Sequence, residues 1–457
     1  MGAAHRELED LRKRVRERLR AEPLAAALGL APGWRDAGAE ELRLVGLVPE
    51  AFELFDDPAD PSSFRPRPPA AGLSLTPEDP ATALAAVRMQ VPAPAKGVAL
   101  GLKLLRDLAR SLDPETAVVL VVKPGVRADS LLGLWRGWGL DPARLRLVEH
   151  ETSTIFAQDN GKGARVDDEP ALLLPLRAGG AAARDALPED GGAFGVPVHT
   201  SRLQWDGGNL LHDGHATLVG ANTVALNELA GGLTTDQVLA QIAAETGGEP
   251  LVLGDLDEAR AALIEAQDAK DPANAREGGQ ADFHIDLDVC PLGVDAAGRP
   301  RVAIADPPAG AAHAPAIERD SRRFEGHFVG PAEARRIFRR NLDATLELRA
   351  PRLELYRRQL GARGYALVPV PDVRLVRRLD YLNRVNFTFN HVNVLPGSHW
   401  GRPAVRAFAY GVAELDAAAA DAYRDAGVDT VTLGDPVTAD EVFALDGGPH
   451  CVVSRLA

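Results

Sequence analysis

The residue types best suited to covalent chemistry lie at the C-terminal end of the sequence. Cys451 follows the turn Gly447-Gly448-Pro449 and His450, and only one other cysteine, Cys290, is present. A lone cysteine usually packs as a small apolar side chain. It acts as a nucleophile where a neighbouring base or a lowered pKa favours the thiolate. Upstream residues that could meet this thiol therefore decide between the two roles.

A histidine and two carboxylates occur together in the segment 283–288, Phe-His-Ile-Asp-Leu-Asp. Alternate residues of a strand face the same side, so this pattern predicts that His284, Asp286 and Asp288 project together. A histidine beside a carboxylate suits acid–base catalysis, and the same pattern is also typical of a half-exposed edge strand. A metal site is a further option, although no second His or Cys with usable spacing is evident.

A third carboxylate, Asp159, follows the apolar residues Ile155-Phe156-Ala157 and precedes Asn160-Gly161. The pattern predicts a strand that ends in a carboxylate at a glycine turn. Aspartate before Asn-Gly is also an ordinary turn former, so the segment alone is a weak sign of function.

Asparagines recur in the segment 383–395. We expect Asn386, Asn390 and Asn393 to alternate on a strand, where their amides could contact a substrate. Asparagine is also common in turns, where its side chain bonds to nearby backbone.

Composition excludes several classes of protein. The net charge of −14 argues against nucleic acid as the main partner, because phosphate binding needs clustered Lys and Arg. Two cysteines cannot build a disulfide framework, and the charged segment 1–20 has no apolar region typical of a signal peptide. No run approaches eighteen apolar residues, so no membrane span is expected. We expect a cytoplasmic protein.

Short apolar runs alternate with amphipathic segments from about residue 116 onward, which predicts a mixed α/β domain built from small modules. The segment 1–115 is expected to be a helical, proline-rich extension, with 58–72 as a linker or wrapping loop. Strands are expected near 116–124, 144–150, 155–159, 171–177, 250–255, 283–293, 301–306, 366–371, 428–433 and 450–455. Helices are expected near 98–113, 129–138, 235–246, 256–268, 331–361 and 414–426.

These motifs, in this order, resemble those of the guanidine-modifying or pentein enzymes, which include protein-arginine, agmatine and arginine deiminases and the amidinotransferases. The segment from Val392-Asn393-Val394-Leu395 through His399, Gly401 and Pro403 is most similar to the protein-arginine deiminase catalytic domain. The motifs that carry the resemblance are Phe156-Ala157-Gln158-Asp159, Trp205-Asp206-Gly207-Gly208-Asn209, His284-Ile285-Asp286 and His450-Cys451.

The resemblance implies a fold and a set of roles. Residues 116–457 would form an α/β propeller of five ββαβ-type modules around a central active site. Asp159 and Asp286 would hold a guanidinium group by charge-assisted hydrogen bonds, with Asn209 and Asn393 also binding substrate. Cys451 would attack the central carbon, and His284 would protonate the departing nitrogen and then activate water. The products would be ammonia and a citrulline-type ureido compound.

Some residues depart from the family or remain outside its pattern. Vertebrate-type protein-arginine deiminases bind calcium through acids just after the Gln-Asp pair, whereas Lys162 stands there in this chain, so we expect calcium independence and no cofactor. The resemblance assigns Cys290 to packing, and we expect His450 to support the Cys451 turn.

Several alternatives stay open. An amidinotransferase would use the same four residues and pass the amidino group to an amine. A non-catalytic pentein module would serve for binding, and a Cys-His-Asp acyl-transfer hydrolase would need an oxyanion hole. The substrate could be an arginine residue of a peptide, free arginine, agmatine or another guanidine. A homodimer is the default expectation for such a fold.

Overall fold

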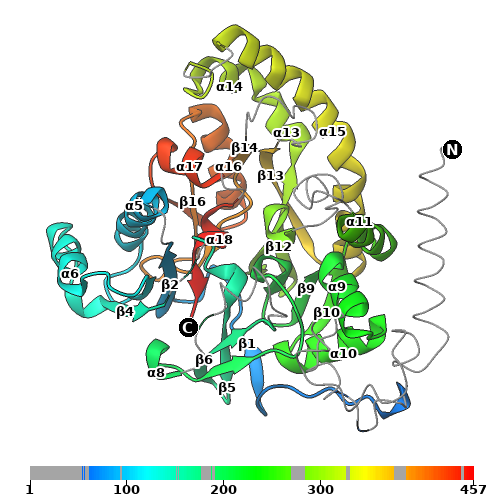
Figure 1. Ribbon diagram of the computed structural model, residues 1–457. Coiled ribbons are helices and arrows are strands. Elements are labelled where there is room, and N and C mark those ends of the chain that lie inside the picture. Colours follow the sequence, from blue (N-terminus) through cyan, green and yellow to red (C-terminus); the bar gives the residue numbers. More distant parts are fainter. Residues whose placement is uncertain are drawn as a thin grey trace.

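A computed structural model of the chain shows a mixed α/β fold (Figure 1). The residues that it describes are 54, 56, 61–92, 95–150, 152, 154–176, 187, 191–268, 284–325, 330–374, 388–443 and 447–456. Residues 1–53 of the expected extension, Phe283 and Asn386 lie outside the described residues.

The described strands form five sheets of three or four strands each. One sheet has the order β1 (Leu73–Leu75), β5 (Lys162–Val166), β6 (Glu169–Leu174), β7 (Val198–Thr200), and a second has β10 (Glu249–Leu253), β9 (Ala216–Gly220), β8 (Leu210–His212). The third has β11 (Val289–Val294), β12 (Pro300–Asp306), β13 (Ala366–Arg374), β14 (Thr388–Asn390). The fourth has β15 (Leu395–Pro396), β16 (Ala404–Ala407), β17 (Asp429–Thr432), and the fifth has β18 (Ser454–Arg455), β2 (Ala86–Val91), β3 (Ala117–Val122), β4 (Leu145–Glu149).

Each sheet combines an antiparallel pair with a parallel pair. Parallel neighbours need a crossover connection, and helices supply it between the paired strands. The described helices are α5 (Ala95–Ser111), α6 (Ala128–Gly137), α8 (Gly191–Phe194), α9 (Ala221–Gly231), α10 (Thr235–Thr246), α11 (Leu256–Asp268), α13 (Pro307–Ala312), α14 (Ala314–Asp320), α15 (Pro331–Ala362), α16 (Ala413–Asp425), α17 (Pro436–Phe443) and α18 (Pro449–Val452). None of these helices is long and apolar enough to cross a membrane.

Strands from before and after residue 115, where the expected extension ends, pair in the same sheets. Strand β1 pairs with β5, and β2 pairs with both β3 and the C-terminal strand β18. Figure 1 shows β2 and β18 side by side although they come from opposite ends of the described chain. This pairing fixes the position of the segment that carries Cys451.

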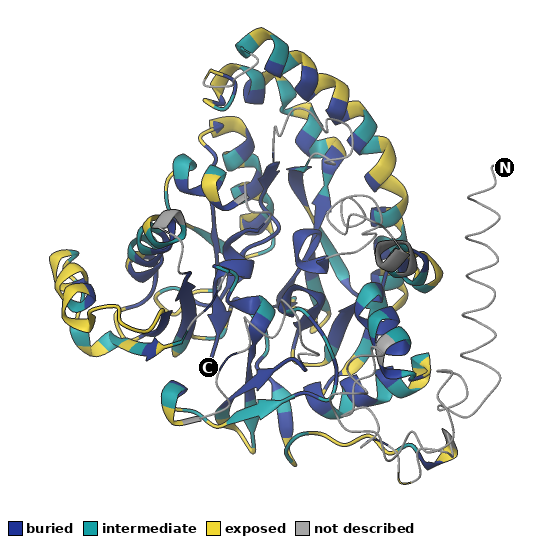
Figure 2. Ribbon diagram, viewed as in Figure 1, coloured by how far each residue is buried: buried dark blue, intermediate teal, exposed yellow. Residues whose placement is uncertain are grey.

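Most strands are largely buried inside the fold and the helices cover them on the outside, whereas β4, β7 and β17 are partly exposed (Figure 2). The long helix α15 shows how sequence periodicity produces this layer, because its buried residues recur at intervals of three or four. They include Ile337, Phe338, Leu342, Leu353, Tyr356 and Leu360. The opposite face of α15 is exposed, as Figure 2 shows in yellow.

The predicted helices α10 and α11 have the expected bounds, and α15 differs from its prediction by one residue at its end. Helix α10 has clear local signals at both ends. The Thr234 hydroxyl accepts from the Gln237 backbone, and the Gln237 side chain accepts from the Thr234 backbone. Gly247 ends the helix with a φ of 73°, which is unfavourable for residues with a side chain.

The strand predictions at the candidate site are wrong. Residues Gln158–Asn160 and Ile285–Leu287 form short 3-10 turns, named η4 and η6, and Cys451 lies on the single-turn helix α18. An alternating pattern in 283–288 and apolar runs beside Gln158 and Cys451 suggested strands. A single 3-10 turn contains only three residues, which is too few for a repeating pattern of apolar residues to reveal it in the sequence.

Candidate active site

Four short helical turns and one bend lie close together in the fold, and each of them precedes a strand of a different sheet. Turn η4 precedes β5, η6 precedes β11, and α18 precedes β18. A further 3-10 turn, η5 (Gly207–Asn209), precedes β8, and the bend at 391–393 precedes β15. Turn η5 contacts η4, η6 and α18, and α18 also contacts η4. The predicted residues Asp159, Asn209, Asp286, Asn393 and Cys451 lie one on each of these turns.

Glycines allow the turns to approach this closely. A side chain at Gly207 would lie 2.1 Å from the backbone oxygen of Gln158, and one at Gly208 would lie 2.9 Å from the Asp286 carboxylate. A side chain at Gly448 would lie 2.4 Å from the Asn393 amide oxygen. These separations are far below van der Waals contact, so the Gly-Gly pairs of the motifs are required by packing between the turns.

Cys451 is buried in the centre of this group of turns, with 1% of its surface exposed. Its backbone N–H donates to Gly448 O over 3.1 Å, which closes the turn. The side-chain amide of Asn393 donates to Cys451 Sγ over 3.3 Å, and Asp286 Oδ2 lies 3.5 Å from the same sulfur. The thiol is therefore held in one orientation by neighbours from two other sheets.

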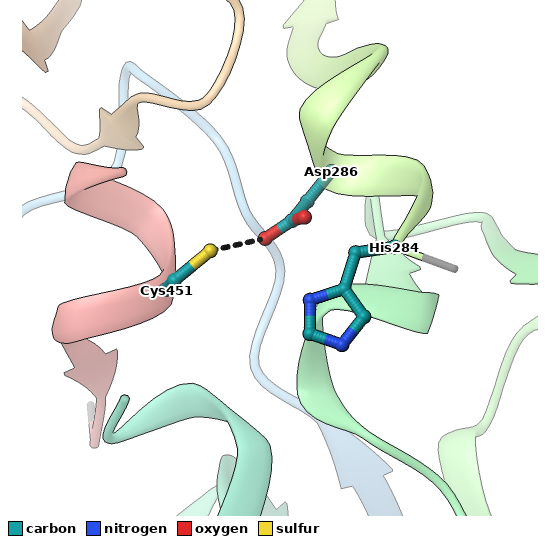
Figure 3. A group of neighbouring side chains, drawn as sticks. All are labelled: His284, Asp286 and Cys451. Atoms are coloured by element: carbon teal, nitrogen blue, oxygen red, sulfur yellow. Dashed lines mark hydrogen bonds between the residues drawn. The ribbon is translucent and has the colours of Figure 1, made fainter. Parts of the chain in front are cut away.

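His284, Asp286 and Cys451 converge (Figure 3). One side-chain donor atom from each lies within 4.8 Å of the other two, and all three residues are buried. The figure shows Cys451 projecting from α18 toward Asp286 and His284 on the facing segment. A soft divalent cation could also take such a set of donors. The set equally provides a thiol nucleophile, a proton carrier and an anion for a cationic group.

The two oxygens of Asp286 have different surroundings. Oδ2 accepts a hydrogen bond from His450 Nδ1 over 2.7 Å, whereas Oδ1 is buried without a hydrogen-bond partner among the described residues. Burial opposes the charge of this carboxylate, but His450 and His284 outweigh it and lower the pKa of Asp286. Asp286 is therefore an ionised, buried carboxylate with one oxygen available to a hydrogen-bond donor.

Asp159 lies on η4, half-buried, and its turn is fixed by the buried side chain of Arg88 on β2. The Arg88 guanidinium donates to Asn160 Oδ1 and to Gly161 O, each over 2.9 Å, and also to Ala157 O. Burial lowers the pKa of Arg88 to about 9, and the charge of Asp159 acts against this shift. The Asp159 carboxylate thus lies near both Arg88 and Cys451, and its negative charge raises the pKa of the Cys451 thiol.

The two asparagines join turns to one another. Asn209 Oδ1 accepts from the backbone N–H of Ile285 over 3.3 Å, which links η5 to η6. Asn393 donates to Asp286 O over 3.2 Å and accepts from the backbone N–H of His450 over 3.0 Å. Asn393 lies in a bend and not in the expected strand. The side-chain oxygen of Asn390 fixes this bend by accepting from the backbone N–H groups of Val392 and Asn393.

Asp288 does not join the site, contrary to the expectation of a shared strand face. The turn η6 rotates it away from Asp286 and toward three arginines. Its carboxylate pairs with Arg349 at 2.7 Å, Arg352 at 2.9 Å and Arg374 at 3.0 Å. Burial opposes the charge of Asp288, but these arginines hold its pKa well below the usual range. Asp288 therefore joins η6 to α15 and β13.

Cys290 lies on β11 and packs in a cluster of buried apolar side chains, as expected. Burial raises the pKa of its thiol well above the usual value, and the charges of Glu78 and Asp286 raise it further.

No pattern in the sequence indicated that the carboxylate of Glu78 lies near the site. None indicated that His450 and Lys162 make buried contacts with this carboxylate. Glu78 lies between Pro77 and Pro80 in the expected helical, proline-rich extension, and no periodic pattern predicts its burial. Lys162 Nζ pairs with Glu78 Oε1 at 2.5 Å and donates to Gly207 O over 3.1 Å. His450 Nε2 lies 3.3 Å from Glu78 Oε2. Glu78, Lys162 and His450 thus form a buried row of charges that ends at Asp286.

Several solved structures share this fold. A candidate agmatine deiminase is 14% identical with a TM-score of 0.53, covering 84% of this chain and 96% of that chain. A candidate arginine deiminase from Porphyromonas gingivalis is 16% identical with a TM-score of 0.52, covering 84% and 98%. An agmatine deiminase from C. jejuni is 12% identical with a TM-score of 0.51, covering 84% and 96%. No family model and no curated protein sequence matches the chain. The chain shares the fold of these three structures, and the mixed α/β class predicted from the sequence is confirmed.

The surroundings of the thiol predict how its reactivity depends on pH. Burial raises the pKa of Cys451, and the charges of Asp286 and Asp159 raise it further. We therefore expect the neutral reagent iodoacetamide to label Cys451 slowly at pH 7 and faster as the pH rises. A cationic haloacetamidine should label it faster than iodoacetamide at pH 7, because a positive charge beside the sulfur favours the thiolate. Mass spectrometry measures both rates, and equal rates for the two reagents would contradict the prediction.

Proposed function

We propose that this protein hydrolyses a guanidinium group to a ureido group and ammonia, using Cys451 as the nucleophile. The convergence of Cys451, His284 and Asp286 within 4.8 Å carries this proposal. The substrate class is an arginine residue of a peptide or a small arginine derivative. The similar structures are those of two agmatine deiminases and one arginine deiminase, two of them candidates, and this similarity supports a guanidine substrate.

Two carboxylates bind the substrate in this proposal. A guanidinium is planar and carries N–H donors in a fixed fork, which matches the geometry of a carboxylate. Asp286 Oδ1 is a buried acceptor without a hydrogen-bond partner among the described residues, and Asp159 offers a second carboxylate from η4. The bound cation also favours ionisation of the nearby thiol, which the two carboxylates disfavour in the free protein.

The chemical steps follow from the positions of the other two side chains. The Cys451 thiolate attacks the central guanidinium carbon and forms a tetrahedral adduct. Ammonia leaves with a proton donated by His284, and a positively charged thiouronium remains on the sulfur. Water then adds to the same carbon while His284 accepts its proton. Cleavage of the C–S bond releases the ureido product and regenerates the thiolate.

The five sheets support the expected arrangement of five modules. Each contains an antiparallel pair and a parallel pair, and each has one strand that follows one of the four turns or the bend at the site. We propose that the sheets are the blades of an α/β propeller whose centre is the active site. A central site formed by one turn from each blade explains why its residues are spread from Asp159 to Cys451 in the sequence.

Product analysis tests the proposed reaction. Purified protein is incubated with a peptidyl-arginine, with free arginine and with agmatine, and ammonia and ureido product are measured. We expect equal amounts of both from at least one substrate. Added glycine or lysine tests amidino transfer, because a transferase would form a new guanidino compound and release an amine in place of ammonia. Absence of turnover with every guanidine would refute the proposal.

Calcium independence is a separate prediction. Lys162, where an acidic ligand was expected, is buried, and its ammonium group is paired with Glu78. A cation in this position repels a dication and offers it no oxygen ligand. We expect the rate to change by less than about twofold between excess chelator and millimolar calcium, a factor too small to indicate a required ion. A rate that appears only with calcium would contradict this.

A further inference from the structure

Four charged side chains form a continuous buried row from β5 to the active site. Lys162 Nζ lies 2.5 Å from Glu78 Oε1, and Glu78 Oε2 lies 3.3 Å from His450 Nε2. His450 Nδ1 lies 2.7 Å from Asp286 Oδ2. All four residues are buried, and their charges alternate when His450 is protonated. The mechanism proposed above uses only the last member of this row.

Carboxylates flank both nitrogens of the His450 ring, and this arrangement favours its protonated form. A neutral ring with Nδ1–H toward Asp286 would direct the Nε2 lone pair at the Glu78 carboxylate, which is repulsive. As an imidazolium, the ring donates from Nδ1 to Asp286 and forms an ion pair with Glu78, whose Oε2 lies 3.3 Å from Nε2. Burial opposes its charge, but Glu78 and Asp286 outweigh this and raise the pKa of His450 to about 9. The Gln158 amide nitrogen lies 2.8 Å from His450 Nε2, so the imidazolium form requires the Gln158 amide to turn its oxygen toward the ring.

Glu78 is in turn held by Lys162. Burial opposes the charge of this carboxylate, but Lys162 and His450 outweigh it and lower the pKa of Glu78 to about 2. The other groups that act on the pair His450–Asp286 are His284 and Cys451, both beside Asp286. A break anywhere along the row leaves a buried charge without its partner.

We propose that Glu78, braced by Lys162, is a positioning residue of the deimination site that acts on Asp286 through His450. It keeps the imidazolium in place, so that Asp286 Oδ2 is occupied and Oδ1 is directed at the guanidinium. This inference rests on the proposed function. It also assigns a role in the site to a segment that precedes the expected catalytic domain.

The variant Glu78→Gln keeps the shape of the side chain and removes its charge. We expect kcat/KM to fall by about tenfold to 10²-fold, mainly through a higher KM, because Asp286 holds the substrate in both the bound and transition states. Without Glu78, His450 loses its proton at a lower pH than in the wild type. Selective ¹⁵N-histidine NMR of the full chain detects this shift directly, independently of activity.

A matched control separates positioning from general stability. Glu228→Gln removes another buried carboxylate, which pairs with Arg260 at 2.6 Å between α9 and α11. We expect this variant to lower the melting temperature and to leave KM and the His450 titration unchanged. The double variant Glu78→Gln/Lys162→Met removes both charges of the pair and should recover stability without recovering kcat/KM. It also serves if the single variant does not fold.

Each outcome decides the inference. A folded Glu78→Gln protein with wild-type KM and an unshifted His450 titration overturns it, as does a double variant whose activity recovers together with its stability. If the wild type turns over no guanidine, the proposed function fails instead. The NMR titrations of wild type and Glu78→Gln then still show whether Glu78 sets the protonation of His450.

Discussion

Replacing Cys451 with alanine is expected to lower the rate of ammonia release by roughly 10⁴-fold or more, because the covalent step has no other nucleophile at this place. The thiol is fixed by Asn393 and faces Asp286 and His284. The variant removes only the sulfur, and the neighbouring turns keep their backbone contacts. We expect the folded protein to retain its affinity for the guanidine substrate, which isothermal titration measures.

The second cysteine provides the matched control. Cys290 is equally buried but packs in an apolar cluster, so Cys290→Ala should keep at least half of the wild-type rate. A haloacetamidine should modify Cys451 in the wild type and in Cys290→Ala, and nothing in Cys451→Ala. Equal activity in wild type and Cys451→Ala would exclude the proposed mechanism. If Cys290→Ala lost activity and Cys451→Ala kept it, the nucleophile would be Cys290 and the assignment to Cys451 would be wrong.

The sequence predicted regular elements well where local signals were strong. Helix α10 has a capping box at Thr234 and a left-handed glycine at its end, and its predicted bounds agree with the structure. The apolar runs at β3 and β12 are long enough for a buried strand to be recognised. In such segments a few neighbouring residues determine the local conformation.

The sequence was least informative at the site itself. The motifs identified Asp159, Asp286 and Cys451 through a resemblance, but the conformation assigned to them was wrong because three-residue turns have no periodicity. Glu78 could not have been found this way. Its buried partner Lys162 lies 84 residues further along the chain, and only the paired strands bring the two segments together.

Two aspartates only two residues apart should respond to mutation in opposite ways. Asp286→Asn is expected to lower kcat/KM by about 10²–10³-fold, the range found when one partner of a buried, hydrogen-bonded charge pair is lost. Asparagine can still accept from His450 Nδ1–H through its oxygen. Because His450 keeps this hydrogen bond and its contact with Glu78, we expect thermal unfolding to show a smaller loss of stability than in Asp288→Asn.

Asp288→Asn should show the reverse pattern, because its carboxylate serves structure and not substrate. It neutralises Arg349, Arg352 and Arg374, which α15 and β13 bring to one place. Loss of this charge leaves buried guanidinium groups underpaired, and breaking a buried pair typically costs about 3–5 kcal/mol of unfolding free energy. We expect a markedly lower melting temperature, with KM within a few-fold of wild type at temperatures where the variant is folded. A stable Asp288→Asn protein with the kinetic defect of Asp286→Asn would show that Asp288, and not Oδ1 of Asp286, binds the substrate.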